Sequence, residues 1–186
     1  MGDALVASNL EAYPSLRLYD AWIEQSFALE RASVRFGSMG ADEEFAGTDG
    51  GAMFTNSAFG WEAGIGANVI NGGPIYFVPA LGARLEFTPS ERWTWRAGAY
   101  DGDSFDSPGG DPAVNAHGLR HSQSRAQGAF LIGEGARQWG AESGGLPGGA
   151  RLGAWRHTAD FPDQHLDDRG GSFVVSGLDP VVHHGS

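Results

Sequence analysis

Apolar and polar residues alternate most regularly in two neighbouring segments, residues 81–87 and 93–100. A period of two residues is typical of β-strands that have one apolar and one polar face. The apolar positions are Leu81, Ala83, Leu85, Phe87, Trp93, Trp95, Ala97 and Ala99, and the polar positions include Arg84, Glu86, Thr94 and Arg96. The intervening segment Thr88-Pro89-Ser90-Glu91 has the composition of a turn. The pattern therefore predicts a hairpin with its two arginines on one face.

A second hairpin is predicted nearer the N-terminus, with strands over residues 16–27 and 32–37 and a turn over residues 28–31. The first of these strands also has two distinct faces. One face carries Arg17, Tyr19, Ala21, Ile23 and Phe27, and the other carries Leu16, Leu18, Asp20, Trp22, Glu24 and Ser26. We assign the first face to apolar surroundings and the second to polar surroundings.

Four further strands are predicted towards the C-terminus. They cover residues 118–123, 129–139, 151–158 and 172–178. Two orientations of the second remain open, because either of its faces can be apolar. One face holds Phe130, Ile132 and Ala136, and the other holds Leu131, Gly133 and Trp139. The whole pattern predicts an all-β antiparallel fold of about eight strands.

Three stretches interrupt the alternation. Residues 33–61 begin as a strand but continue with Asp42, Glu43 and Glu44 and then a run of glycines. Long ordered loops on a sheet usually carry function, so we expect this loop to fold back against the sheet. Residues 63–73 and 101–116 are also predicted to be loops, the second too polar to be buried.

Composition narrows the class of protein. Glycine accounts for 30 of the 186 residues, about twice the ordinary ~7%, which suits turn-rich β structure. No apolar run approaches the ~20 residues of a membrane helix. The net charge of −11 argues against nucleic acid as a partner, and the absence of cysteine excludes disulfides and thiolate sites. All twelve cations are arginine, which reflects either genomic base composition or a use for planar guanidinium groups.

Several segments resemble the carbohydrate-selective porins of bacterial outer membranes, the OprB family. They are LRLYDAWIEQSF, GADEEF, FTNSAFGW, GGPIYFVPALGARLEFTPSERWTWRAGAYDGD and LPGGARLGAWRHTADF, and they span most of residues 9–161. The resemblance implies a transmembrane β-barrel of porin type, filled with water, that passes carbohydrates by facilitated diffusion. It places the apolar strand faces against lipid and the polar faces in the lumen. Trp93 and Trp95 then suit an interfacial girdle.

The resemblance also bears on the extent of the domain. Such porins close with about sixteen strands, so residues 1–186 are expected to form a single partial barrel whose N- and C-terminal strands are missing. Residues 1–3 lack the features of a signal peptide, which we interpret as truncation, with the full-length protein in the outer membrane. The expected partners are small carbohydrates and outer-membrane lipid, with a monomer or a homotrimer as the full-length assembly. No cofactor is expected.

The polar residues of the strands and of the long loop are candidates for a sugar-binding constriction. Sugar recognition needs paired hydrogen-bonding groups and an aromatic face. The candidate residues are Trp22, Glu24, Arg35, Asp42, Glu43, Glu44, Arg84 and Arg96, with Glu86 on the same strand face as Arg84. Opposed charges that bind weakly would let a sugar leave as well as enter. The alternative is a solvated acidic loop beside ordinary cross-strand ion pairs.

Metal binding is weakly supported by the sequence. Residues 101–106 alternate acids at first, but Phe105 replaces a ligand of the EF-hand loop and Pro112 stands at the bidentate glutamate position. His117 and His121 lie four residues apart, a spacing that separates two side chains along a strand. We therefore assign no metal site, although an ion bound to the loop of residues 101–116 stays open.

Enzyme motifs are also missing. The chain has no lysine for a phosphate-binding loop and no serine in a nucleophile elbow, so we expect a protein that is not an enzyme. A different class remains as the alternative function, a secreted β-sandwich module that binds carbohydrate. In a sandwich the face that bears Ile23 and Trp95 would pack on a second sheet, whereas in a barrel it would meet lipid.

Overall fold

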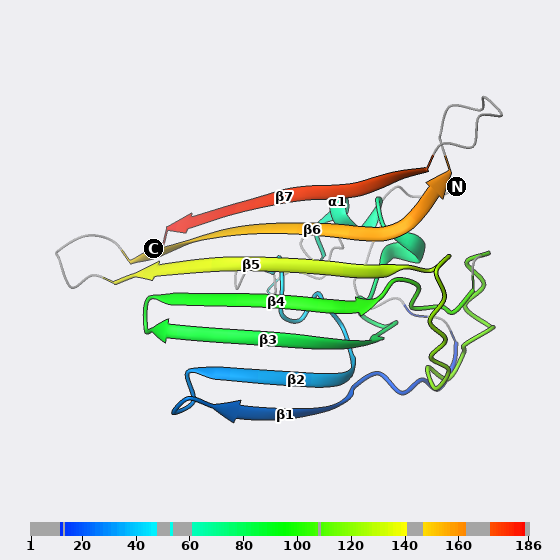
Figure 1. Cartoon of the computed structure of the whole chain (residues 1–186), viewed down its shortest axis with the longest axis horizontal. Helices are drawn as coiled ribbons and strands as arrows, with labels where there is room; N and C mark the ends of the chain where they lie inside the picture. Colours follow the sequence, from blue (N-terminus) through cyan, green and yellow to red (C-terminus); the bar gives the residue numbers. More distant parts are fainter. Residues whose placement is uncertain are drawn as a thin grey trace.

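The computed structural model describes residues 12, 14–47, 53, 61–107, 109–140, 147–162 and 172–184, the last range for its backbone alone. Seven strands form one antiparallel sheet in which each strand pairs with the next along the chain (Figure 1). The strands are β1 (Ala21–Phe27), β2 (Ala32–Met39), β3 (Ala80–Ser90), β4 (Trp93–Asp101), β5 (Ala129–Trp139), β6 (Gly148–Pro162) and β7 (Ser172–His184). Among these strands β1 and β7 do not pair with each other, so the sheet is open.

The observed sheet confirms the predicted all-β antiparallel partial barrel, with one strand fewer than expected. The strand predicted over residues 118–123 is absent. The backbone of these residues instead forms hydrogen bonds with side chains of the preceding loop. The Arg120 N–H donates to Asn115 Oδ1 at 3.1 Å, and the Ser122 N–H donates to Asp106 Oδ2 at 3.0 Å. Because these amides are bound to loop side chains, they are not available to a sheet ladder.

The short and long connections lie at opposite ends of the sheet (Figure 1). The β1–β2 and β3–β4 turns are short, whereas the β2–β3 and β4–β5 connections span residues 40–79 and 102–128. In the former, the helix α1 (Ala63–Gly66) and the 3-10 turn η3 (Ile70–Gly72) replace the predicted plain loop. Glu62 caps α1 by accepting from the Gly64 and Ile65 N–H groups. No helix among the described residues is long and apolar enough to cross a membrane.

The outward face of the sheet is built from in-register rows of mostly apolar and small residues. The rows are Ile23, Phe36, Ala83, Ala99, Leu131 and Arg156; then Gln25, Val34, Leu85, Ala97, Gly133 and Ala154; then Phe27, Ala32, Phe87, Trp95, Gly135 and Leu152. Many of the large side chains are exposed, Ile23 at 75% and Trp95 at 52%. The described residues form no second sheet over them, so the β-sandwich alternative is not favoured.

The core lies between the inner face of the sheet and the β2–β3 connection. Phe45, Ile65 and Val69 of the connection pack against inward residues of the strands, including Tyr100 and Phe130. This packing decides the open orientation of β5: Phe130 and Ile132 are buried inward, and Leu131 is 38% exposed on the outside. The inner face is therefore apolar where the connection covers it.

Two expectations at the end of the sheet with the long connections are wrong. Arg17 and Tyr19 precede β1 and do not share its outward face, since the Leu18 N–H donates to the His117 carbonyl and Tyr19 Oη donates to Glu43 Oε1. The start of the 101–116 loop is also buried, although it is polar. Asp103 and Asp106 are 2% and 7% exposed, because neighbouring amide groups donate to their carboxylates.

Residues 1–11 and 163–171 and most of the segment FTNSAFGW lie outside the described residues.

Candidate constriction site

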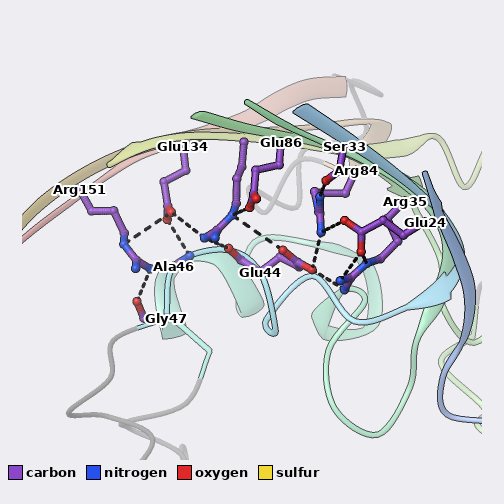
Figure 2. Close-up of polar contacts among 11 residues, drawn as sticks. Glu24, Ser33, Arg35, Glu44, Ala46, Gly47, Arg84, Glu86, Glu134 and Arg151 are labelled. Atoms are coloured by element: carbon purple, nitrogen blue, oxygen red, sulfur yellow. Dashed lines mark hydrogen bonds and ion pairs between the residues drawn. The ribbon is translucent and has the colours of Figure 1, made fainter. Parts of the chain in front are cut away.

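Charged side chains from β1 to β6 converge on the β2–β3 connection at the inner face of the sheet. Figure 2 shows the strands arching over the connection, with the strand side chains pointing towards the segment from Glu44 to Gly47. The members are Glu24, Arg35, Arg84, Glu86, Arg96, Glu134 and Arg151 of the strands and Glu44 of the connection, called here the charge network. These four glutamates and four arginines balance in formal charge.

The charge network begins where three strands place ionised residues side by side. Glu24 faces Arg35 across β1 and β2, and Arg35 faces Arg84 across β2 and β3. Like charges directly opposite on a sheet repel, so two facing arginines need anions between them. Glu24 supplies one: Oε2 accepts from Arg35 Nη2 at 2.9 Å, and Oε1 accepts from Arg84 Nη2 at 3.2 Å.

Glu44 supplies the second anion, from outside the sheet. Its Oε1 accepts from Arg35 Nη1 at 2.5 Å and from Arg84 Nη2 at 3.3 Å. Its Oε2 lies 3.8 Å from Arg96 Nε, and its main-chain carbonyl accepts from Arg96 Nη1 at 3.1 Å. Because the Glu44 carboxylate neutralises arginines of β2, β3 and β4, these strand charges hold the connection in place (Figure 2).

The network continues to β6 through a second set of contacts. Arg96 Nε donates to Glu86 Oε2 at 2.6 Å, and Glu134 Oε1 lies 3.5 Å from Arg151 Nε. Glu134 Oε2 also accepts from the Ala46 N–H at 3.0 Å, and Arg151 Nη1 donates to the carbonyl of Gly47 at 2.5 Å. Residues 44, 46 and 47 of the connection are thus each bound to side chains of the strands.

Apolar packing seats the same connection between its polar contacts. The Phe45 side chain is 1% exposed and lies edge-to-face with Tyr100, with ring centroids 6.4 Å apart. A Cβ atom at Gly98 would approach the Phe45 ring at 3.0 Å, so glycine is needed there for the ring to reach the wall. The connection is therefore held against the sheet by apolar packing as well as by ion pairs.

Trp22 stands at the edge of the charge network. The Arg35 guanidinium lies over its indole ring, 3.9 Å from the ring centroid, a cation–π arrangement that fixes the arginine further. Arg35 has five N–H groups, and three hydrogen bonds to carboxylates are formed. The other two N–H groups form no hydrogen bond with a described residue.

The structure brings together six of the eight candidate residues: Trp22, Glu24, Arg35, Glu44, Arg84 and Arg96. Asp42 and Glu43 have separate roles within the connection. Asp42 Oδ2 accepts from the Tyr76 N–H at 2.9 Å, and Glu43 accepts from Tyr19. Burial raises the pKa of the Asp42 carboxyl to about 6, against the lowering effect of the Tyr76 N–H.

Three members of the charge network, Glu86, Glu134 and Arg151, were not among the eight candidates. Glu134 has the same parity in β5 as Phe130 and Ile132, the face whose orientation the sequence left open. Arg151 follows a glycine-rich segment at the start of β6, where alternation is weak. Glu86 was placed on the correct face by alternation alone. Within the described part of the chain, no group of three or more His, Asp or Glu residues could hold a metal ion.

An open antiparallel sheet with an exposed apolar exterior, and with a charged inner face covered by a folded-in connection, is typical of part of a porin-type transmembrane barrel. Comparison with protein families gives the same result. The model of the carbohydrate-selective porin, OprB family, matches residues 4–185, so the chain belongs to that family.

A solved structure supports the fold. The high-pH structure of Pseudomonas putida OprB superposes with a TM-score of 0.73 at 22% sequence identity. The match covers 96% of this chain and 43% of that chain, so this chain spans less than half the length of its structural relative. None of the curated proteins compared with the chain matches it.

Proposed function

We propose that the full-length protein containing this chain is an outer-membrane porin that passes small carbohydrates by facilitated diffusion. The charge network forms the narrowest part of its water-filled lumen. The observation that carries the proposal is the position of Glu44, on a connection that folds onto the inner face of the sheet and binds arginines of three strands.

The chemistry of the network suits neutral, hydroxyl-rich solutes. Its charges are paired among themselves, so it attracts neither cations nor anions strongly through a net field. Spare N–H groups of the arginines and lone pairs of the glutamates can form hydrogen bonds to the hydroxyl groups of a sugar. They can thus replace its water shell one hydroxyl group at a time. A solute that makes only such exchanged hydrogen bonds binds weakly, and weak binding permits exit.

Diffusion through such a pore requires no catalytic step. Membership of the family supports a transport channel. The outward rows of apolar side chains, exposed along β1 to β6, suit contact with the hydrocarbon of a bilayer.

Liposome swelling tests the proposal. Vesicles that contain the full-length protein should swell rapidly in an isosmotic neutral hexose and slowly in a neutral tetrasaccharide, which is too large for a narrowed lumen. Protein-free vesicles and vesicles with heat-denatured protein are the controls. Absence of hexose-driven swelling, with the barrel shown folded by heat-modifiable gel mobility, would reject the proposed function.

A further inference from the structure

The outward rows of the sheet carry an asymmetric set of charges. Although the chain has 23 acidic residues, the three rows from Ile23 to Leu152 and the adjacent row of Trp93, Arg137 and Ala150 contain no acid. Their charged residues are two arginines, Arg137 and Arg156. The next outward row holds the buried Asp101, but the four rows named here carry cations alone and are complementary to an anionic molecule that lies against the exterior of the barrel.

The two arginines have different surroundings. The Arg137 guanidinium lies 5.4 Å from the ring centroid of Trp93, in the half of β5 near the short turns. Arg156 is paired in register with Leu131, near the end of β5 that follows the long β4–β5 connection, whereas β6 itself continues to Pro162. It is exposed and forms no ion pair with a described side chain. Among the described side chains, Arg156 is thus an outward cation without an anionic partner.

A shallow apolar groove runs beside Arg156. Its volume is about 360 Å³, and its outward lining consists of Ala97, Leu131, Gly133, Ala154 and Arg156. The small side chains of Ala97, Gly133 and Ala154 form one row across β4, β5 and β6, so the surface is lowered there relative to Leu85 in the same row. The groove is thus a shallow apolar depression with the Arg156 cation beside it.

The position of Arg156 suits the boundary of the hydrocarbon. An outward arginine costs about 2–4 kcal/mol at the middle of a bilayer but close to zero near its surface. Leu131, its neighbour in register, is two residues from the start of β5 at Ala129, roughly 7 Å along a strand. The long arginine side chain can span this distance and place its guanidinium among lipid head groups.

We propose that Arg156 and the groove form a binding site for an anionic membrane lipid. The guanidinium binds the lipid phosphate through two N–H groups, and one acyl chain lies along the row of Ala154, Gly133 and Ala97. Arginine suits this role because its planar fork matches a phosphate with two parallel hydrogen bonds. The inference goes beyond passage of sugars and depends on the strands spanning a membrane.

Native mass spectrometry of the full-length protein in detergent tests the proposal, with dimyristoylphosphatidylglycerol and dimyristoylphosphatidylcholine as probes. The wild-type protein should retain the anionic lipid preferentially. Arg156→Gln should weaken its retention about fivefold, the effect of one arginine near a charged lipid surface. Ala154→Leu should weaken it by filling the groove while leaving the arginine in place. Arg137→Gln is the matched control, and it should leave this site unchanged.

Each contrary result is decisive. Equal retention of the two lipids by the wild-type protein overturns the proposal without any variant. An equal loss in Arg137→Gln and Arg156→Gln shows a general charge effect with no defined site, and it also overturns the proposal. A change in the number of protein copies on Arg156→Gln or Ala154→Leu assigns the surface to contact between copies. The sugar-driven swelling rate should be unaffected in all three variants, so this proposal can fail while the porin function stands.

Discussion

Replacement of Glu44 by glutamine tests the role of the charge network most sharply. The substitution keeps the size of the side chain and one carbonyl acceptor but removes the negative charge shared by Arg35, Arg84 and Arg96. Glu44 is 10% exposed in its side chain and Arg84 is 3% exposed. The repulsion between the facing arginines Arg35 and Arg84 is then compensated by Glu24 alone.

The structure sets the scale of two effects. Hydrogen bonds to charged groups contribute about 1.5–3 kcal/mol, so loss of the Glu44 charge should weaken the seating of the connection by about 2 kcal/mol. The network also changes from balanced to one net positive charge. A unit charge a few ångströms from an ion contributes about 1 kcal/mol in a watery pore, which corresponds to about a fivefold shift of permeability towards anions at low salt.

The assay is the reversal potential of the full-length porin in a planar bilayer under a potassium chloride gradient. Glu43→Gln is the matched control, because Glu43 is adjacent in sequence but accepts a hydrogen bond from Tyr19 outside the charge network. We expect Glu44→Gln to shift the reversal potential towards anion selectivity and to increase current noise, and Glu43→Gln to do neither. Equal reversal potentials in the two variants would refute the assignment of Glu44 to the narrowest part of the lumen.

Three further predictions concern neighbouring residues. Arg35→Lys should weaken sugar block of the ion current by about 1–2 kcal/mol with conductance nearly unchanged, because an ammonium keeps the charge but loses the planar fork; equal sugar affinity would remove Arg35 from the site. Phe45→Ala should lower the free energy of unfolding of the connection by about 3 kcal/mol, since a buried phenyl group is lost. The urea dependence of protease cleavage of the connection measures this change. Asp42→Asn should stabilise the protein by about 2 kcal/mol at pH 7.5 and not at pH 4. The Asp42 carboxyl, whose pKa is raised to about 6 in the folded protein, binds its proton more tightly there than in the unfolded chain. The free energy of unfolding of the wild-type protein therefore falls as the pH rises from about 4 to about 6. Equal denaturant midpoints of wild type and Asp42→Asn at both pH values would count against the burial of this carboxylate.

The sequence predicts most of the strand residues of the charge network, because the alternation of apolar and polar residues is a local pattern. Arg84, Glu86 and Arg96 were placed on the inner face from a period of two residues, and the register of β3 with β4 agrees. The same logic failed in β5, where glycines at 133 and 135 and apolar residues on both faces remove the contrast between inside and outside. The inward position of Phe130 depends on the β2–β3 connection that covers it, which no local pattern contains.

The connection itself shows the limit of pattern reasoning. Asp42, Glu43 and Glu44 are consecutive acids, and the sequence offers no basis for separating them. In the structure they have three different partners: a main-chain amide, a tyrosine hydroxyl and a set of arginines. The difference arises because Phe45 and Ala41 are buried in the core, and this packing sets the direction of each acid between them.

The measurement that tests the central claim most directly is sugar protection of a thiol placed in the charge network. The chain has no cysteine, so Glu86→Cys, in a full-length protein without other thiols, introduces one reactive group beside Arg96. A water-soluble thiol reagent should reduce the single-channel current of this variant, and a neutral hexose at saturating concentration should slow the reaction. Ile23→Cys, on the outward face, should show neither effect. Modification of Glu86→Cys that leaves the current unchanged, or that proceeds at the same rate with and without hexose, would contradict the claim that sugars pass through the charge network.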